Sequence, residues 1–308
     1  MNIFKKYPSI ENRYQTKFIM HFVGQHPNIK DSRFIIYEKL HGSNISLVFY
    51  DGEFNICSRN RIIKKTENFN MCWEVVKQYS EFVDFWKKKS TDGKKYTFFG
   101  EIVGDGIQKG VKYHNERKIY LFDLMVNDIL QTQNTFFHFL SYNDNYNLCP
   151  IIKNDVSFDD MINFPNEFNS TILNKENNVC EGIVIKPFDR VFICGGNHFL
   201  LKSKNEKFSE KTKEKKVVKD ENREMDESVL KMKLEFDRYI NENRVNNIFS
   251  REGIIQDNKE IGKFIKLILR DAQEDFLKDN DISSFTSKEM KFIFNCSKEI
   301  VEILRKYM

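Results

Sequence analysis

The chain up to about residue 204 alternates short apolar segments with turn residues. These segments are rich in β-branched and aromatic side chains, a pattern typical of β-strands. The dipeptide Asp51-Gly52 lies between two of them and predicts a tight hairpin, because glycine tolerates the positive φ angles that such turns require. Strands are predicted at residues 33–37, 45–50, 54–58, 96–103, 120–126, 179–186 and 198–204, and helices at residues 69–88 and near 135–142.

The pattern changes after residue 204. Residues 205–227 are mostly charged, and apolar residues then recur every three or four positions, the period of an amphipathic helix. These stripes predict the core of a small helical domain rather than a cofactor site. We place the boundary near residues 210–225, which gives domains at 1–220 and 221–308. The stripes are Val229, Met232, Phe236 and Ile240, then Ile261, Phe264, Ile265, Ile268, Leu269 and Ala272, and then Ile293, Ser297, Ile300, Val301 and Leu304.

The composition fits a folded chain of two domains, since 308 residues are enough for two cores. A hydrophobic fraction of 40% excludes a disordered chain, and no apolar run approaches the roughly 20 residues of a membrane helix. Six scattered cysteines without a Cys-x-x-Cys pair argue against a zinc knuckle or a disulfide framework, and predict mostly buried free thiols. Because residues 1–14 lack the apolar core of a secretory signal, we expect a cytoplasmic or nuclear protein that is neither secreted nor bound to a membrane.

Basic and acidic residues are nearly balanced, with 49 Lys and Arg against 45 Asp and Glu. The balance conceals a local excess, because residues 202–219 hold eight lysines and three glutamates. Such a stretch suits a polyanion such as RNA or a nucleotide phosphate. A solvated linker or helix surface explains the same charges, and charge alone favours this second interpretation.

The run Glu38-Lys39-Leu40-His41-Gly42-Ser43-Asn44 is the most informative for chemistry, since it lies between two predicted strands. A lysine that follows a strand and precedes a tight glycine turn is held on a rigid scaffold, where its amine suits a nucleophile. The amine has to lose its proton to react, which requires desolvation or nearby positive charge. Taken alone the run is weak, because surface lysines before turns are far commoner and a single histidine is more often structural.

Five further short strings follow this run along the chain. Each has a structural interpretation of its own, with Phe122 as a core aromatic, Glu181 as a strand-edge charge and the lysines as a solvated face. The six strings together, in this order, favour a shared chemical role. The five are Ser58-Arg59-Asn60, Gly100-Glu101-Ile102-Val103-Gly104, Leu121-Phe122-Asp123-Leu124, Glu181-Gly182-Ile183-Val184-Ile185-Lys186 and Leu201-Lys202-Ser203-Lys204.

In this order the strings resemble the covalent nucleotidyltransferases, the superfamily of polynucleotide ligases and messenger-RNA capping enzymes. DNA ligases and capping enzymes have Asp and Arg where this sequence has His41 and Asn44. Lysine followed by His-Gly-x-Asn resembles the nick-sealing RNA ligases of the second phage type, relatives of the kinetoplastid editing ligases. The resemblance covers about residues 30–280. It implies an α+β fold, with an N-terminal adenylyltransferase domain of antiparallel sheets and flanking helices and a small all-helical C-terminal domain instead of an OB barrel.

The resemblance implies an ATP-dependent RNA ligase that joins 3′-hydroxyl and 5′-phosphate RNA ends at nicks in duplex RNA. Lys39 would attack the α-phosphorus of ATP to give lysyl-AMP, AMP would pass to the RNA 5′-phosphate, and the 3′-hydroxyl would displace it. The implied cofactors are ATP and Mg²⁺, which Mn²⁺ could replace, with Glu181 as the metal-binding carboxylate. The implied nucleotide-binding residues are Glu38, Asn44, Arg59, Glu101, Phe122, Lys202 and Lys204.

Three of these assignments also have a physical argument. Lys202 and Lys204 are two apart on a strand, so they face one side and can both reach the α-phosphate, where their charge would favour deprotonation of Lys39. Phe122 offers a flat apolar face to adenine. The resemblance further implies RNA binding by His41, Arg244 and Asp271, with Arg244 inside a family-like signature of residues 243–247 and Asp275 one helical turn after Asp271. A plain surface residue before a turn stays open as the alternative for Arg244.

Two other functions stay open. An RNA guanylyltransferase would use the same lysine chemistry with GTP, and a catalytically inactive RNA-binding protein could keep the fold. RNA is the expected partner, an end-healing kinase or phosphatase is a further candidate, and the chain is expected to be a monomer. The sequence identifies neither the biological RNA nor the role of residues 1–30.

Overall fold

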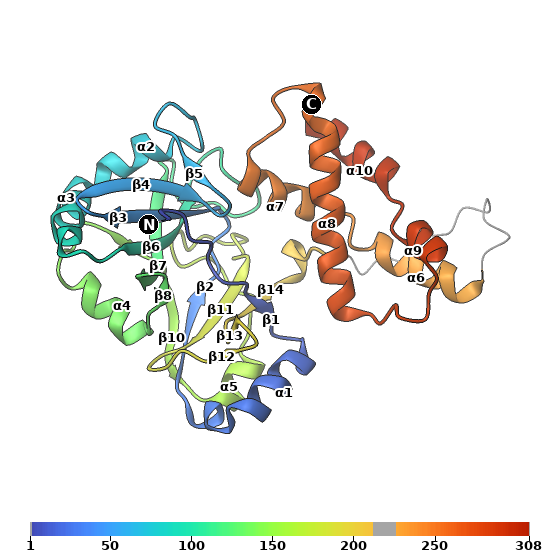
Figure 1. The fold of residues 1–308 in the computed structure, drawn as a ribbon, viewed down its shortest axis with the longest axis horizontal. Coiled ribbons are helices and arrows are strands. Elements are labelled where there is room, and N and C mark those ends of the chain that lie inside the picture. Colours follow the sequence, from blue (N-terminus) through green and yellow to red (C-terminus); the bar gives the residue numbers. More distant parts are fainter. Residues whose placement is uncertain (1, 212–225, 308) are drawn as a thin grey trace. The chain divides into compact units, whose positions relative to one another are not determined.

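The computed structural model describes residues 2–211 and 226–307. Contacts between Cα atoms divide the chain into two compact units, Met1–Lys207 and Phe208–Met308, which are drawn from blue to yellow and from yellow to red in Figure 1. The domain boundary predicted between residues 220 and 221 falls outside the described residues, and so do residues 212–219 of the lysine-rich stretch.

The first unit contains a seven-stranded sheet with the order β5-β4-β3-β6-β7-β8 and with β9 paired to β7. Its long strands pair antiparallel, whereas β9 lies parallel to β7. The predicted hairpin joins β3 to β4, and Asp51 and Gly52 have φ angles of 52° and 74°. The strands are β3 (Ser43–Tyr50), β4 (Glu53–Ser58), β5 (Ile62–Ile63), β6 (Tyr96–Val103), β7 (Lys118–Val126), β8 (Ile129–Leu130) and β9 (Asn147–Leu148).

A second sheet of five strands has the order β1-β14-β11-β2-β10. Its central strand β11 pairs antiparallel with both β2 and β14, so the motif strings on these three strands become neighbours. The edge strand β1 lies parallel to β14. The strands are β1 (Glu11–Asn12), β2 (Phe34–Glu38), β10 (Ile151–Val156), β11 (Gly182–Pro187) and β14 (Leu201–Lys204), and a separate hairpin contains β12 (Ile193–Cys194) and β13 (Asn197–His198).

Helices cover both sheets of the first unit. Val75 of α2, Trp86 of α3 and Phe136 of α4 belong to the hydrophobic core that these helices share with the seven-stranded sheet. Phe22 and Met161 bind α1 and α5 to the five-stranded sheet, where the helices lie beside the strands in Figure 1. The helices are α1 (Thr16–Gln25), α2 (Cys72–Val75), α3 (Ser80–Lys89), α4 (Gln133–Leu140) and α5 (Phe158–Asn163), with 3₁₀ turns at Pro27–Asp31, Val76–Tyr79, Ser90–Asp92 and Glu206–Phe208.

Local backbone geometry accounts for three differences from the predicted elements. The helix predicted at 69–88 starts late and is broken by a 3₁₀ turn, because Asn70 and Met71 have left-handed φ angles of 51° and 54°. The strand predicted at 179–186 begins only at Gly182, where φ is 145°. The strand predicted at 198–204 is divided into β13 and β14, and Phe199 and Leu200 lie between the two strands.

The second unit is helical throughout its described residues, as the apolar stripes predict. Its core contains buried residues from all five helices, with Phe264, Ile268, Ala272 and Phe276 at four-residue spacing along α8. The helices are α6 (Glu227–Asp237), α7 (Glu242–Glu252), α8 (Ile261–Asp279), α9 (Ser287–Ile293) and α10 (Ser297–Leu304), with 3₁₀ turns at Asn258–Glu260 and Arg305–Tyr307. The predicted α+β fold with a helical C-terminal region and no barrel there is confirmed.

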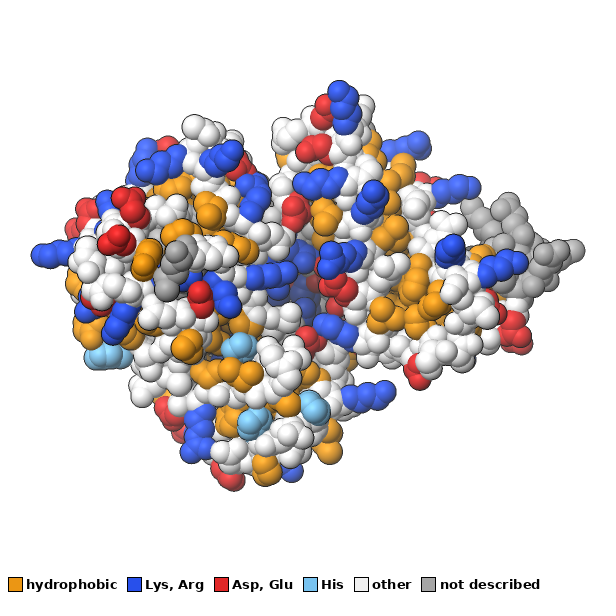
Figure 2. All heavy atoms as spheres, in the orientation of Figure 1, with side chains coloured by type: hydrophobic (Ala, Val, Ile, Leu, Met, Phe, Trp, Pro, Cys, Tyr) orange, Lys and Arg blue, Asp and Glu red, His pale blue; other side chains and the backbone are white. Residues whose placement is uncertain are grey.

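The cysteines lie where the sequence predicts them, and basic and acidic side chains are intermixed. Five of the six cysteines are buried free thiols, and Cys194 is half-buried. Lysine and arginine side chains are interspersed with acidic and apolar ones on the face drawn in Figure 2. None of the helices in the described part of the chain has both the length and the apolar character that a membrane crossing needs.

Candidate active site

Lys39 follows β2 directly, at the place where the chain leaves the five-stranded sheet for β3. Its backbone N–H donates to the carbonyl oxygen of Gly182 at the start of β11, 2.8 Å away. Two glycines permit this close packing. A Cβ atom on Gly42 would lie 2.2 Å from the Ile102 carbonyl oxygen, and one on Gly182 would lie 2.0 Å from that of Ser203. The glycines in the two motif strings are therefore required by backbone contacts.

Glu181 is the centre of the site. Its side chain is 2% exposed, and its Oε2 lies 2.8 Å from the Nζ of Lys39 while its Oε1 lies 3.0 Å from the Nζ of Lys204. Burial alone would raise the pKa of Glu181, but Lys39, Lys204 and His41 hold the pKa well below its ordinary value. A carboxylate that stays charged thus aligns two lysines from strings more than 150 residues apart in the sequence.

His41 connects this carboxylate to a neighbouring loop. Its Nδ1 lies 3.3 Å from Oε2 of Glu181, and its Nε2 lies 3.0 Å from the carbonyl oxygen of Lys109. The imidazole ring thus bridges the Glu181 carboxylate and the backbone of the Lys109 loop. The backbone N–H of His41 donates to the hydroxyl of Tyr113, 2.8 Å away. His41 therefore fixes the loop around Lys109 to the site.

Glu38 is buried beside the nucleophile candidate. Its Oε2 accepts hydrogen bonds from the backbone N–H and the hydroxyl of Thr171, at 2.8 and 2.7 Å. Its Oε1 is buried without a hydrogen-bond partner. A buried acceptor of this kind is costly unless a ligand donates to it. The geometry suits recognition of an amino group.

Glu101 and Asn44 lie opposite each other on β6 and β3. Burial and the nearby charge of Glu181 raise the pKa of Glu101 to about 7, against the opposing influence of Lys39, Arg59 and the Gly42 N–H. The carboxyl of Glu101 can therefore donate a hydrogen bond near neutral pH. Arg59, directly after β4, is half-buried and close enough to influence the pKa values of both Glu101 and Tyr7.

Phe122 and Lys202 complete the predicted nucleotide set. Phe122 is half-buried on β7, and its ring makes a T-shaped contact with Tyr7 at a centroid distance of 5.3 Å. Lys202 and Lys204 are two residues apart on β14, opposite Val184 and Gly182 of β11, so both point to one face of the sheet. The structure therefore brings the sequence-predicted residues of the first unit into one neighbourhood.

Arg244 lies in the second unit, inside α7, and its side chain is 1% exposed. Its guanidinium contacts Asp271 and lies 3.0 Å from Asp275 and 3.6 Å from Glu210. Burial alone would lower the pKa of Arg244, but the three carboxylates raise it above the ordinary value. The alternative of a plain surface residue is thus wrong. Contact of Arg244 and Asp271 with RNA stays a prediction, and in this conformation the arginine has almost no surface for a phosphate.

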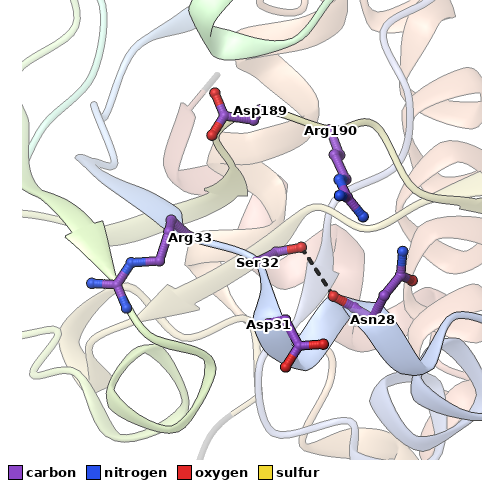
Figure 3. Close-up of a pocket in the computed structure, with 6 residues that line it drawn as sticks. All are labelled: Asn28, Asp31, Ser32, Arg33, Asp189 and Arg190. Carbon is purple, nitrogen blue, oxygen red and sulfur yellow. Dashed lines mark hydrogen bonds between the residues drawn. The ribbon is translucent and has the colours of Figure 1, made fainter.

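A separate hollow of about 270 Å³ lies at the far end of β2 from Lys39. Its charged side chains diverge, since Arg33 and Asp189 point away from Arg190 in Figure 3. Arg33 is instead bound to Asp155, 2.6 Å away. We therefore assign no ligand to this hollow, which is lined by Asn28, Asp31, Ser32, Arg33, Asp189 and Arg190.

Sequence reasoning gave no role to several residues that adjoin the site. Asp123 and Lys186 belong to two of the motif strings and are charged residues within mainly apolar strands. This signal could have identified them as candidates for a role at the site. Tyr7 and Thr171 had no local signal, because their contacts depend on segments far away in the sequence.

Solved structures with a similar fold include three of an RNA ligase from Naegleria gruberi. A variant without ligand has 20% identity and a TM-score of 0.50, and covers 66% of this chain and 56% of its own. Variants with AMP and Mn and with ATP and Mn both have 19% identity and a TM-score of 0.50. They cover 66% and 68% of this chain and 57% and 58% of their own. The chain thus spans little more than half the length of these structures.

Two family descriptions match consecutive parts of the chain. The description "RNA ligase" matches residues 32–204, which is more than half of the chain and includes all six motif strings. The description "T4 RNA ligase 2 C-terminal" matches residues 211–303, a range that includes the helices α6 to α9 and most of α10. The resemblance found in the sequence is confirmed, and the chain belongs to the RNA ligase family.

Proposed function

We propose that this chain is an ATP-dependent RNA ligase that joins 3′-hydroxyl and 5′-phosphate ends, at nicks in duplex RNA, through lysyl-AMP and RNA-adenylate. The observation that carries the proposal is the meeting of Lys39, Lys204 and His41 at the single buried carboxylate Glu181. Three cationic or potentially cationic groups around one anion leave an excess of positive charge, which suits a polyphosphate. Family membership and the fold shared with the Naegleria gruberi RNA ligase support the same conclusion.

In the first step the Nζ of Lys39 attacks the α-phosphorus of ATP, and the bond to the pyrophosphate oxygen breaks. The amine has to be free of its third proton for this attack. Glu181 orients Nζ rather than taking that proton, because its pKa is held well below the ordinary value. Lys202 and Lys204, on one face of β14, would neutralise the phosphate oxygens as charge moves to the leaving group.

The base and sugar would be held by residues on the surrounding strands. Phe122 offers its half-buried ring for stacking on adenine, and the unpaired Oε1 of Glu38 suits the adenine amino group. Glu101, whose raised pKa leaves it partly protonated near pH 7, suits a ribose hydroxyl, with Arg59 close to it. Asn44, opposite Glu101 on β3, suits the AMP phosphate and the incoming 3′ end.

Glu181 is also the candidate ligand for a divalent cation. The donor chemistry fits, because a buried carboxylate that stays ionised is a hard oxygen ligand of the kind that Mg²⁺ or Mn²⁺ prefers. Such an ion, when bound, would neutralise phosphate charge. It would also compete with Lys39 for Oε2, which favours release of the lysine amine from its ion pair.

In the later steps the AMP of Lys39 passes to the RNA 5′-phosphate, and the 3′-hydroxyl then displaces AMP as the phosphodiester bond forms. His41, through its contacts with Glu181 and with Lys109, would place the loop around Lys109 toward the RNA. Arg244 and Asp271 would act in the helical unit, which we propose grips the duplex beside the nick. Because Arg244 is buried, its proposed role is to shape that unit.

The test begins with ATP labelled at the α-phosphate in the presence of Mg²⁺. Wild type and the control Lys77→Ala, which changes an exposed lysine paired with Glu74, should retain label on the protein. Lys39→Ala should retain none. Adding unlabelled nicked duplex RNA should move the label from wild-type protein to the 5′-phosphate and then release it as AMP.

Each alternative has its own result in this experiment. Labelling by GTP instead of ATP would indicate a guanylyltransferase, and no labelling by either nucleotide would indicate an inactive RNA-binding protein. Equal labelling of wild type and Lys39→Ala would remove Lys39 from its role. Label transfer to single-stranded ends but not to nicks would contradict the proposed substrate.

A further inference from the structure

Asp123 and Lys186 form a buried ion pair that the proposed chemistry does not use. Their side chains are 1% and 2% exposed, and Nζ of Lys186 lies 2.7 Å from Oδ2 of Asp123. Asp123 also accepts hydrogen bonds from the hydroxyl of Tyr7 and the side-chain amide of Gln133, so both of its oxygens are used. Gln133 in turn accepts from the hydroxyl of Tyr37 at 2.6 Å. Charges are expensive to bury, so a network satisfied to this degree calls for a reason.

The network is attached to Phe122, the residue proposed to stack on adenine. Lys186 donates to the backbone carbonyl of Phe122 at 2.8 Å, and its Nζ lies 4.8 Å from the centroids of both the Phe122 and Tyr37 rings. Because Lys186 is buried, the ring surface that it covers faces the interior, while Phe122 itself stays partly accessible. The ammonium thus holds both the backbone and the ring of Phe122 from behind.

Tyr7 brings the N-terminal segment into the same network. Its ring packs against Phe99 at 5.0 Å and against Phe122 at 5.3 Å, within a small cluster of buried residues. Burial and the charge of Asp123 raise the pKa of Tyr7 well above its ordinary value, so its hydroxyl stays a donor at any ordinary pH. Four residues later β1 pairs with β14, where Arg13 N–H donates to the Lys202 carbonyl at 2.8 Å. The segment therefore contacts both the base side and the phosphate side of the site.

We propose that Tyr7, Asp123 and Lys186 are positioning residues that hold the Phe122 ring at the angle required to stack on a purine base. The inference rests on the proposed function, since it assumes that ATP binds at this site. Stacking on a phenylalanine ring gives a larger net affinity when the orientation of the ring is fixed before the base arrives, because less side-chain freedom is lost on binding. Lys186 contacts one face of the Phe122 ring and Tyr7 makes a T-shaped contact with it. Both residues are bound to the buried Asp123, so together they fix the orientation of the ring.

The first test is Tyr7→Phe, which removes one hydroxyl and keeps the aromatic packing. Its matched control is Tyr96→Phe, because the buried Tyr96 donates to Asp92 at 2.6 Å in the same unit without contacting Phe122. Label transfer is measured over a range of ATP concentrations, with tripolyphosphate as a competitor that has no base. The half-saturating ATP concentration of Tyr7→Phe should rise about threefold to tenfold. Its maximal rate and its inhibition by tripolyphosphate should match those of wild type and of the control.

The second test is the double variant Asp123→Asn with Lys186→Met, which removes both charges together. Lys95→Met with Asp128→Asn is its control, since Lys95 is fully buried and lies 2.6 Å from Asp128. The half-saturating ATP concentration of the first double variant should rise about tenfold or more, while its inhibition constant for tripolyphosphate should stay unchanged. The control double variant should keep the wild-type half-saturating ATP concentration.

Two results would overturn the inference while leaving the proposed function intact. One is a wild-type half-saturating ATP concentration in both Tyr7→Phe and the double variant. The other is an equal loss of affinity for ATP and for tripolyphosphate, which would indicate a general distortion of the site. If wild-type protein takes no label from ATP, the proposed function itself fails and this inference fails with it.

Discussion

Each unit of the molecule contains a buried cluster of charges, and the two clusters have opposite compositions. In the first unit, Lys39, Lys204 and His41 surround the single carboxylate of Glu181. In the second unit, three carboxylates surround the guanidinium of Arg244, and Arg251 binds Asp271 at 2.7 Å. The first cluster has cations in excess, whereas the second has anions in excess.

The two clusters also differ in how far solvent reaches their cations, and this property distinguishes a binding site from a structural contact. The lysine side chains of the first cluster keep some contact with solvent, at 20% exposed for Lys39 and 11% for Lys204. They can therefore exchange their shared carboxylate for a phosphate. Arg244 is 1% exposed and already neutralised, so a phosphate would have to displace its own partners. Charge excess and access together support the proposal that the first cluster is the site of the chemistry.

The largest expected effect on stability comes from Arg244→Met. The change removes the cation that three neighbouring carboxylates share and leaves only Arg251 at Asp271, so it should lower the free energy of unfolding by on the order of 3 to 5 kcal/mol. Urea unfolding of the full chain measures this. The control Arg270→Ala, which breaks an exposed pair with Glu274 on the same helix, should stay within about 1 kcal/mol of wild type. A stable Arg244→Met protein that loses only RNA binding would contradict the comparison and make Arg244 an RNA contact.

Next in size is the effect of Glu181→Gln on activity. The variant keeps the shape of the side chain and removes the charge that aligns Lys39 and Lys204, so the rate of lysyl-AMP formation should fall about a hundredfold or more. Its loss of unfolding free energy should be smaller than that of Arg244→Met, since both lysines can reach water. The label-transfer rate and urea unfolding, measured on the same preparation, check both parts. A rate within a factor of about three of wild type would show that Glu181 is not the centre of the site.

The smallest effect concerns Glu101, a carboxyl outside the first cluster whose pKa is influenced by burial and by the charges of Lys39 and Glu181. Its folded-state pKa, about 7, lies above the ordinary value of 4.5, so the folded protein retains a proton that the unfolded chain loses. The stability from this group is therefore complete below about pH 4.5 and is lost as pH rises through about 7, on the order of 3 kcal/mol in all. Urea unfolding at pH 5 and pH 7.5 should show that Glu101→Gln loses less stability with pH than wild type does. Parallel pH profiles for the two proteins would contradict the raised pKa.

Most of the fold could be predicted because its cause is local. The hairpin at Asp51-Gly52 follows from the backbone freedom of glycine, and α8 follows from apolar residues at helical spacing. The predictions erred where a few residues adopt unusual backbone angles, as at Asn70 and Met71, which delay α2. The pattern of apolar residues does not predict such backbone angles.

The candidate site could also be predicted only in part from the sequence. The motif strings identified the residues that gather around Glu181, because each string has its own residue types and the order of the strings is characteristic. Arg244 was placed among the RNA-binding residues with a surface position as the alternative, yet the structure buries it among carboxylates. No role was predicted for Tyr7, because a single aromatic residue near the N-terminus gives no signal of its own. Its role depends on the contact with Asp123, which only the fold brings about.

The order of residue types along the chain was enough to determine the family, the mixed first unit, the helical second unit and the lysine proposed as nucleophile. Tertiary structure alone decided which charges meet: His41 and Glu181 are 140 residues apart in the sequence, and Tyr7 and Asp123 are 116 apart. The physical reason is that the side-chain periods of strands and helices depend on neighbouring residues, whereas the energy of a buried charge depends on which distant groups surround it.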